Sequence, residues 1–596
     1  MSLNLNSTRN SVHFWRPLLV LFGFAGCHRE PTPVVPPKVE GTFVTTERQP
    51  SLARLPFEFT KSYTPRPNQA DDWFEDITDK TGIRFQYRTG CEARYYTILE
   101  SVGGGVALFD YDLDGDLDLF LTGGGRISAP PVTVGGVTSA LYRNDGDWNF
   151  TDVTESIGLN RDDLYTHGTT VGDFDHDGYP DLLITGYGGC RLFRNDGGKR
   201  FVDAPMPSVG GSRWFTSAAW GDFDRDGWVD LFAVCYAEWH LTDDVCVQRQ
   251  MQGTRRDTCA PTRYAGQQSC LFRNQGDGTF AEVSNAAGIL PGMRSLGIVT
   301  ADLDGDGWLD WFVANDVQDN QLYWGTDQLP LDEGGTVAGV AFSESGDRDG
   351  SMGTDIVDFD GDGELDLFIA NYAGQDNMLM RSVGGRSFVN VTRASGLSAP
   401  SRRWVKFASL FADFDLDGWP DLFISNGHVL YDAHDLPYLQ PAQLFQNQHG
   451  KQFREVTTNA GPYLSIPHAG RGAAVGDLDN DGAPDLVVMH QDQPVAILRN
   501  KHQATHWVRL SLRGKASGID PVGAKVFLQQ DGITMTSVFS GGGSYLSHSD
   551  RRALFVTTSD EPVQVTVVWP GGAREVFTNL VTRTTHELVE GSGRHP

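Results

Sequence analysis

Recognisable catalytic motifs are missing from this chain of 596 residues. It has no Gly-x-Ser-x-Gly elbow, no His-Glu-x-x-His pair and no glycine-rich loop with the spacing that cradles phosphates. Its histidines are scattered rather than paired. These absences argue against serine hydrolases, zinc proteases and P-loop nucleotidases.

Positive charge and long apolar runs are also scarce. Lys and Arg number 48 against 77 Asp and Glu, and no basic stripe or nucleic-acid motif is present, which argues against a nucleic-acid ligand. The apolar run from Leu18 to Phe24 is too short to cross a bilayer as a helix, and no other stretch qualifies. Any membrane attachment must therefore come from the N-terminus.

Aspartate is abundant, in a nine-residue pattern, D-x-D-x-D-G-x-x-D, that occurs seven times with no spacing broken. Four Asp in each of seven copies account for 28 of the net −29 charges, so the acidity belongs to these segments and not to a general surface field. Close carboxylates repel one another and need a cation among them. Ca²⁺ fits because it takes six to eight hard oxygen ligands in irregular geometry.

The pattern assigns a role to each position. The first three Asp face one centre, Gly makes the sharp turn, and the carbonyl of the seventh residue and the ninth Asp complete the shell. An EF-hand would need a bidentate Glu at position twelve, where this chain has apolar residues such as Leu121. We therefore predict up to seven Ca²⁺ ions in loops of another kind.

We number the loops 1 to 7 in chain order. Their predicted ligands are Asp110, Asp112, Asp114, Asp116 and Asp118; Asp173, Asp175, Asp177, Tyr179 and Asp181; Asp222, Asp224, Asp226, Trp228 and Asp230; Asp302, Asp304, Asp306, Trp308 and Asp310; Asp358, Asp360, Asp362, Glu364 and Asp366; Asp413, Asp415, Asp417, Trp419 and Asp421; and Asp477, Asp479, Asp481, Ala483 and Asp485.

The N-terminus reads as an export signal. Residues 1–27 have a basic start and a short apolar run, and they end in Phe24-Ala-Gly-Cys27, which resembles the lipobox of bacterial lipoproteins. The resemblance implies acylation of Cys27 and an outer-membrane or cell-surface location; plain secretion, to the periplasm or outside the cell, and an uncleaved signal anchor are the alternatives. Residues 28–70 are rich in Pro and predict a disordered tether.

Residues 71–503 predict an all-β fold, a seven-bladed β-propeller with calcium loops. A short strand of small residues precedes each Asp loop, an apolar strand follows it, and two further strands complete the unit, as in Leu141-Tyr-Arg-Asn144 and Phe150-Thr-Asp-Val-Thr154. The seventh unit lacks its last strand, whereas the N-terminus supplies an unmatched one, Phe74-Glu-Asp-Ile-Thr78. The early strand is predicted to close the ring and so to bury both sheet edges.

These units resemble FG-GAP/VCBS-type calcium repeats. Residues 504–592 do not follow the repeat pattern. Three of their segments resemble the ASPIC/UnbV domain: Ser517–Lys525, Ser540–Leu546 and Val567–Gly572. A hairpin at Pro570-Gly571 predicts a small β-sandwich. Together with Met352-Gly-Thr-Asp355, these features resemble the bacterial relatives of cartilage acidic protein. Where that family usually has Phe-Gly-Leu-Gly, this chain has Phe555-Val-Thr-Thr558.

Six cysteines remain beyond Cys27, an even number that suggests disulfides in an exported protein. Cys246–Cys259 would close the longest insertion, and Cys235 and Cys270 could face each other across two strands; the pairing of Cys91 and Cys190 stays open. Zinc is disfavoured because no Cys-x-x-C accompanies them. The insertion also carries Trp239 and Tyr264, and it is either a partner-binding edge or a solvated loop.

The sequence therefore predicts a calcium-stabilised, surface-anchored or exported binding or adhesion module, expected to be a monomer, for a protein or polysaccharide. The alternatives are a carbohydrate-active enzyme, lyase or hydrolase, that uses the mouth of the propeller channel, and a purely structural envelope role. Neither the ligand nor the role of the C-terminal domain follows from the sequence.

Overall fold

The computed structural model describes residues 66–595, apart from 129–132, 210–211, 243, 245, 251–252, 434–435 and 531. The predicted signal segment with Cys27, and most of the predicted tether, lie outside the described residues. No helix in the described part is long and apolar enough to cross a membrane.

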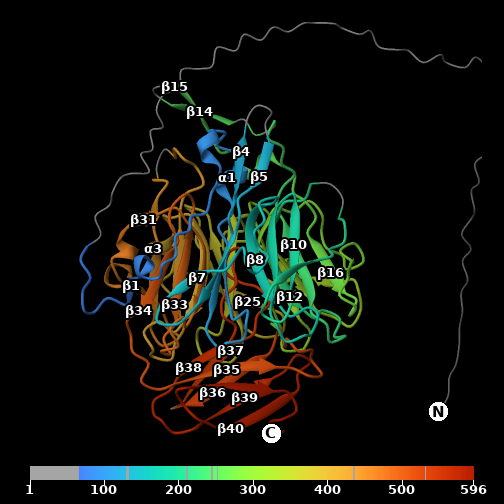
Figure 1. The fold of residues 1–596 in the computed structure, drawn as a ribbon, viewed down its shortest axis with the longest axis vertical. Helices are drawn as coiled ribbons and strands as arrows, with labels where there is room; N and C mark the ends of the chain where they lie inside the picture. The colour runs from blue at the N-terminus through green and yellow to red at the C-terminus, as the bar shows by residue number, and fades with distance from the viewer. Residues whose placement is uncertain are drawn as a thin grey trace, which may run out of the picture. The chain divides into compact units, whose positions relative to one another are not determined.

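The predicted all-β class is confirmed (Figure 1). Among the described residues, α-helix is limited to α1 (Ile98–Ser101), α2 (Gly335–Ala338) and α3 (Ser398–Ser401), of four residues each. The short 3-10 turns are η1 (Thr78–Lys80), η2 (Cys91–Ala93), η3 (Pro261–Arg263), η4 (Thr457–Asn459) and η5 (Tyr463–Ser465). Almost all other regular structure is antiparallel sheet.

Within the described residues, seven four-stranded sheets each contain one Asp loop, and we call these sheets blades 1 to 7. From the inner to the outer strand they are β2 (Val106–Phe109), β3 (Asp118–Leu121), β6 (Ala140–Asn144) and β7 (Phe150–Asp152); β8 (Tyr165–Gly172), β9 (Asp181–Tyr187), β10 (Gly189–Asn195) and β11 (Phe201–Ala204); and β12 (Phe215–Gly221), β13 (Asp230–Cys235), β16 (Cys270–Asn274) and β17 (Phe280–Glu282).

The other four blades follow the same order. They are β18 (Ser295–Ala301), β19 (Asp310–Asn315), β20 (Gln321–Trp324) and β21 (Asp332–Glu333); β22 (Ser351–Val357), β23 (Asp366–Asn371), β24 (Met378–Ser382) and β25 (Phe388–Asn390); β26 (Lys406–Ala412), β27 (Asp421–Asn426), β29 (Gln443–Asn447) and β30 (Phe453–Glu455); and β32 (Gly470–Gly476), β33 (Asp485–His490), β34 (Ala496–Asn500) and β1 (Phe74–Asp76).

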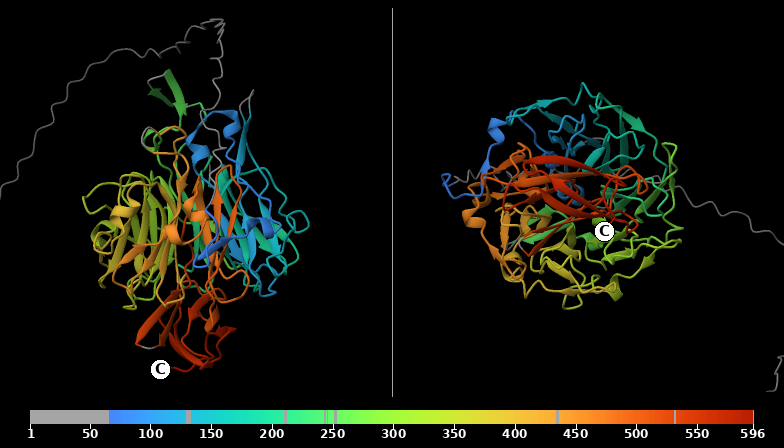
Figure 2. Two further views of the ribbon diagram at one scale, coloured as in Figure 1. Left: turned by 90° about the vertical axis from the view of Figure 1, so that its left-hand side faces the viewer. Right: turned by 90° about the horizontal axis from the view of Figure 1, so that it is seen from below.

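The blades form a closed ring. Their innermost strands contact one another in the order β2, β8, β12, β18, β22, β26, β32 and back to β2 (Figure 2). The predicted closure is confirmed, because β1 pairs with β34 in the register Phe74 to Asn500 and thereby adds the outer strand of blade 7. The strand from the N-terminal side thus fastens the last blade and covers its edge.

The side chains of the second strand of a blade point alternately to its two faces, and this explains how neighbouring blades pack together. In β3, Leu119 and Leu121 belong to a buried cluster with Val487 and Ile497 of blade 7. Phe120 points to the opposite side and packs in the cluster formed with blade 2. Successive side chains of a strand alternate between its faces, so a continuous apolar strand suits a sheet that is covered on both sides.

The C-terminal domain is a sandwich of two sheets, as predicted. One sheet has the order β38 (Ala553–Val556), β35 (Trp507–Arg513), β41 (Thr584–Val589), and the other has β37 (Ile533–Val538), β36 (Lys525–Gln530), β39 (Val563–Val568), β40 (Arg574–Leu580). They share one core. The predicted hairpin is present, with Val568 opposite Arg574, and Phe555 of the divergent segment is a core residue of β38.

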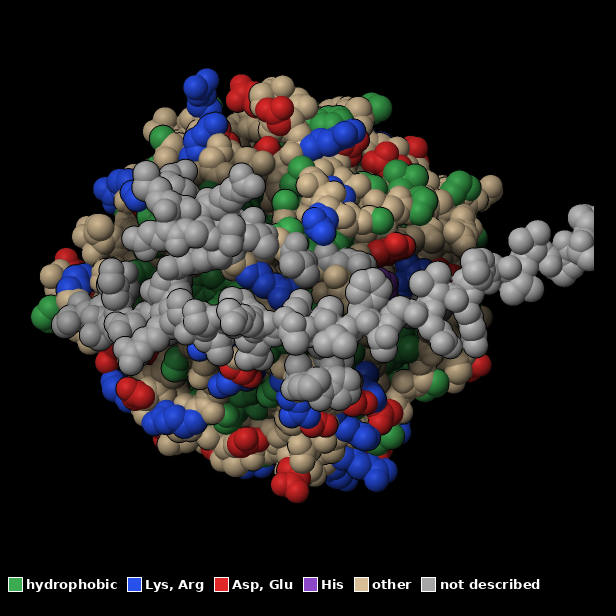
Figure 3. Space-filling view, turned by 90° about the horizontal axis from the view of Figure 1, so that it is seen from above, with side chains coloured by type: hydrophobic (Ala, Val, Ile, Leu, Met, Phe, Trp, Pro, Cys, Tyr) green, Lys and Arg blue, Asp and Glu red, His purple; other side chains and the backbone are tan. Residues whose placement is uncertain are grey.

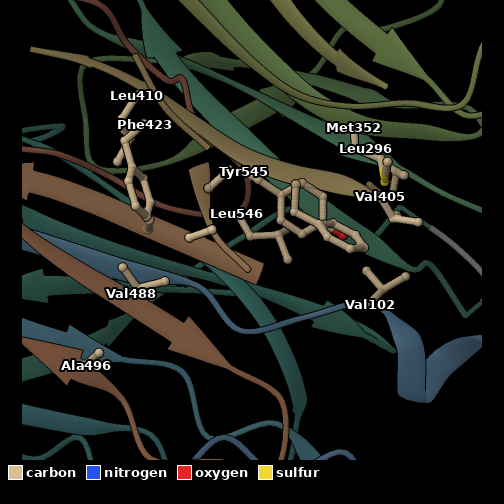
Figure 4. Packing of buried hydrophobic residues seen from close by; sticks show 14 of the residues in the cluster. Val102, Leu296, Met352, Val405, Leu410, Phe423, Val488, Ala496, Tyr545 and Leu546 are labelled. Carbon is tan, nitrogen blue, oxygen red and sulfur yellow. The ribbon is translucent and has the colours of Figure 1, made fainter. Parts of the chain in front are cut away.

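A segment of this domain, residues 540–552, enters the centre of the ring; we call it the plug. Its backbone forms hydrogen bonds of 2.8–3.1 Å with six of the seven innermost strands, through the pairs Leu108–His548, Thr169–Leu546, Trp220–Gly541, Ile298–Gly543, Thr354–Ser544 and Val475–Asp550. Tyr545, which is fully buried, packs 5.0 Å from the Phe407 ring of the remaining inner strand, β26 (Figure 4).

The other end of the ring is covered by segments outside the blades. Two hairpins, β4 (Gly125–Ser128) with β5 (Thr133–Gly136) and β14 (Cys246–Gln250) with β15 (Gly253–Asp257), lie there with α1, and β28 (Gln440–Pro441) pairs with β31 (Pro467–His468) (Figure 1). Around the rim, basic and acidic side chains are interspersed (Figure 3).

The blade 3 insertion helps to close this end, and its aromatic residues are not a contact surface. Trp239 and Tyr264 are 2% and 5% exposed. Trp239 Nε1 donates to Asp244 Oδ2 at 2.6 Å, and the same oxygen accepts the Ile98 backbone N–H at 2.9 Å, at the start of α1. The insertion is therefore fixed to the segment that precedes blade 1.

Candidate metal centres

All seven Asp loops connect the first strand of a blade to the second, and they lie at the end of the ring that the C-terminal domain covers. Contacts from that domain reach loops of several blades: Thr536 Oγ1 donates to Asp358 Oδ2 at 2.6 Å, and Arg552 Nη1 donates to the Gly115 carbonyl at 3.3 Å. The repeated pattern thus produces a ring of acidic loops beneath a second domain.

The first Asp and the Gly hold each loop in one conformation. The Gly backbone N–H donates to the first Asp Oδ2 at 2.8–3.2 Å in every loop. In loop 1, Asp110 Oδ1 also accepts from the Asp114 N–H at 3.0 Å, and Gly115 has a φ of +99°. Positive φ suits glycine, which explains why this position does not vary among the seven copies.

The ninth Asp of each loop ties the loop to its blade. Asp118 is fully buried, and its two oxygens accept the backbone N–H groups of Tyr111, within the loop, and Asn144, at the end of β6, at 3.0 and 2.9 Å. The same arrangement recurs at Asp181, Asp230, Asp310, Asp366, Asp421 and Asp485. Burial raises the pKa of Asp118 to about 8, because the ionised carboxylate is poorly solvated there. A nearby cation would offset this cost of ionisation.

The structure brings the predicted carboxylates together. In at least five loops, three Asp each offer an oxygen within 4.8 Å of the others; among these groups are Asp110, Asp112 and Asp118; Asp173, Asp175 and Asp181; Asp222, Asp224 and Asp226; Asp302, Asp304 and Asp306; and Asp358, Asp360 and Asp366. Oxygen ligands alone, in an irregular loop, are the donor set that Ca²⁺ prefers. The carbonyl ligand at the seventh position stays a prediction.

Unpartnered oxygens test whether these loops suit a cation. In the described part of the chain, five loops each contain one buried carboxylate oxygen without a hydrogen-bond donor: Asp112 Oδ1, Asp173 Oδ1, Asp224 Oδ1, Asp360 Oδ1 and Asp415 Oδ1. A buried charged oxygen without a partner is costly, and coordination to a cation would satisfy it. The residues present therefore fit a bound Ca²⁺, with Asp side chains as its holders.

The sequence analysis missed the role of the Asn that ends the third strand. Asn274 Nδ2 donates to the Phe174 carbonyl in the loop of blade 2, at 2.8 Å, and to the Val229 carbonyl in its own loop, at 3.2 Å. Equivalent bonds to the preceding blade are made by Asn144, Asn195, Asn447 and Asn500. Recurrence of this Asn as the last residue of the third strand, in five of the seven units, was the available signal.

Side chains at the seventh position also join neighbouring loops. The Trp228 ring of loop 3 stacks 4.0 Å from His176 of loop 2, and Arg225 of loop 3 lies 3.8 Å above the Trp308 ring of loop 4. Loops 2, 3 and 4 are thus in contact through these side chains, so an ion in one of them would also support the position of its neighbours.

The disulfide prediction is confirmed at one pair and wrong at the other. Cys246 and Cys259 are bonded and close the insertion. Cys235 and Cys270 do approach each other, since one thiol lies within hydrogen-bonding reach of the other, but they are free thiols and form no disulfide. In the strand register Cys270 lies directly opposite Ala233, so the two cysteines are diagonal neighbours. Cys91 and Cys190 are also free.

Comparison with known proteins agrees with this architecture. The FG-GAP-like repeat family matches residues 110–184, 173–233, 262–313, 302–369 and 358–424, and the ASPIC and UnbV family matches residues 514–595. A lectin of Agrocybe aegerita, described by its specific recognition of non-reducing terminal N-acetylglucosamine, has a TM-score of 0.36 and 14% identity, over 66% of this chain and 86% of the lectin.

Two curated relatives carry the same name. Cartilage acidic protein 1 of Mus musculus is 28% identical over 245 residues, which are 40% of this chain and 36% of the relative. The Homo sapiens protein is 29% identical over 246 residues, 40% of this chain and 35% of the relative, so the match spans about a third of these relatives. The chain is a protein of FG-GAP-like repeats with a C-terminal ASPIC and UnbV domain, and it is similar to cartilage acidic protein 1.

Proposed function

We propose that the chain is an exported, calcium-binding module that uses a rigid propeller to hold an extracellular protein or polysaccharide. The observation that supports it most is the set of five buried, unpartnered carboxylate oxygens, one in each of five Asp loops. Calcium at these loops would stabilise the ring and its contacts with the C-terminal domain. Export accords with the Cys246–Cys259 disulfide, since such bonds persist in oxidising compartments.

Binding is favoured over catalysis because the plug occupies much of the centre of the ring, although a cavity of about 250 Å³ remains between the plug and the innermost strands of blades 5 to 7. The plug contacts all seven innermost strands from one end. Toward the other end, Arg471 is fully buried and donates to the carbonyls of Ser101 and His428, both at 3.0 Å. An enzyme that used the channel mouth would need open space there for substrate.

The end opposite the C-terminal domain is the proposed ligand face. Its segments differ from blade to blade, and variable loops on a rigid scaffold are where binding residues usually lie. The proposed lipid at Cys27 would anchor the protein, and the tether would hold the propeller away from the membrane surface.

A binding assay with a matched activity assay tests this function. Residues 28–596 would be incubated with immobilised acidic and neutral polysaccharides and with extracellular matrix proteins, in calcium and in chelator. The proposal expects retention that requires calcium, without release of soluble products. Release of oligosaccharides from any substrate would contradict it and favour the carbohydrate-active alternative.

A further inference from the structure

The seven loops share one pattern but not one environment, and loop 7 differs most. Arg509, from β35 of the C-terminal domain, donates through Nη2 to Asp477 Oδ2, the first Asp of that loop. Its Nη1 donates to Asn480 Oδ1 at 2.6 Å, within the same loop. The side chains of Arg509 and Asp477 are 2% and 1% exposed.

Arginines beside the other loops are placed differently. Arg273 contacts Asp224 and Asp226 of loop 3 and is 42% exposed, and Arg386 contacts the corresponding Asp304 and Asp306 of loop 4 and is 39% exposed. Both approach the second and third Asp, from the solvent side. Such exposed side chains can move into water when a cation binds.

Arg509 has no such freedom. It lies between the propeller and its own domain, with its guanidinium carbon 5.1 Å from the centre of the Trp507 ring. The Trp507 ring in turn packs against Gly482, at the turn of the same loop. The guanidinium is thus enclosed between the C-terminal domain and the propeller, with almost no exposure to water.

The oxygens of loop 7 are also satisfied. Five loops have a buried carboxylate oxygen without a donor, whereas among the described residues no Asp of loop 7 has one, and neither does any Asp of loop 4. Besides Arg509, Trp148 Nε1 donates to Asp479 Oδ2 at 3.0 Å, and the Arg499 Nε is 3.2 Å from the same oxygen. The charge that calcium would supply is therefore already present in protein side chains.

We infer that Arg509 replaces a divalent cation in loop 7, so that this loop serves as a docking contact for the C-terminal domain and calcium binds at no more than six loops. A fixed, buried guanidinium and a divalent cation at one carboxylate would repel each other in a poorly solvated site. This inference rests on the proposed calcium binding of the other loops. It gives one of seven similar loops a separate task, in the blade that also closes the ring.

The number of bound calcium ions tests this inference. The number of ions bound to residues 28–596 would be measured by equilibrium dialysis and elemental analysis. The wild type would be compared with Asp477→Asn and Asp110→Asn, which change the first Asp of loop 7 and of loop 1. The inference expects one ion fewer for Asp110→Asn and an unchanged number for Asp477→Asn. Loss of one ion in Asp477→Asn would overturn it.

Arg509→Met provides the converse test, with Arg386→Met of loop 4 as its matched control. Removal of the buried guanidinium should add one bound ion, whereas Arg386→Met should add none. A folded Arg509→Met variant that binds no additional ion would contradict the inference; if that variant does not fold, the two Asp variants decide. Absence of bound calcium from the wild type would overturn the proposed function and this inference together.

Discussion

The two ends of this propeller are built on different principles. At one end, seven copies of one loop pattern share their hydrogen bonds, and a single domain covers them. At the other, the segments are unique: an insertion closed by a disulfide, two hairpins and a buried network around Arg471. The first end thus repeats one set of contacts, whereas each segment of the second end occurs once, as the proposed ligand face would require.

The largest expected effect concerns the plug, which joins the two ends through the centre. Tyr545→Ala removes a fully buried ring that packs on Phe407, and we expect a loss of about 3–5 kcal/mol in the free energy of unfolding. Urea unfolding would measure it. Val389→Ala, at an exposed position, should cost less than about 0.5 kcal/mol. Equal effects of the two changes would show that the plug does not stabilise the ring.

A second prediction concerns pH and the unique end. Burial raises the pKa of Glu100 to about 8, with further increases from the charges of Asp244 and Asp492. Between the ordinary value of 4.5 and about 8, folded Glu100 keeps a proton that the unfolded chain releases, so its contribution to stability falls as the pH rises. The slope is at most about 1.4 kcal/mol per pH unit.

Glu100→Gln keeps the oxygen that accepts from the Thr97 N–H and cannot ionise. Stability curves from pH 5 to 8 should therefore be flatter for the variant than for the wild type, most clearly between about pH 5.5 and 7. Parallel curves would mean that Glu100 is not the group that titrates.

The contacts between repeated loops provide a third, smaller effect. Asn274→Ala leaves the Phe174 and Val229 carbonyls without this donor and should cost about 1–3 kcal/mol by chemical denaturation. Gln275→Ala, at the exposed neighbouring position, should be close to neutral. If Asn274→Ala is also neutral, the Asn bonds between blades are not a source of ring stability.

The smallest effect is expected from a single ion. Asp224→Asn removes the unpartnered oxygen of loop 3 and should lower stability by about 0.4–1.4 kcal/mol at about 1 mM Ca²⁺, since sites of the extracellular type bind at roughly 10⁻⁴ to 10⁻³ M. Thermal unfolding in calcium and in chelator would measure it. The deficit should disappear in chelator; a deficit that persists there would indicate a structural role without metal.

What could be predicted from the sequence follows the same division. The Asp loops, the alternating second strands and the closing strand Phe74–Asp76 were readable because each feature recurs or is conspicuously missing from one unit. The plug was not, because residues 540–552 have no partner in the sequence and their contacts come from seven distant strands. Trp239 in the insertion looked available for a partner and is buried, since a single occurrence does not distinguish packing from recognition.

The most direct test of calcium as the element that holds the ring is the melting temperature of residues 28–596 in chelator and across added Ca²⁺, with Mg²⁺ as the control. Six occupied loops would add about 2–8 kcal/mol at about 1 mM Ca²⁺. We predict a large upward shift in melting temperature with Ca²⁺ that Mg²⁺ does not reproduce. An unchanged melting temperature would contradict calcium binding by the Asp loops.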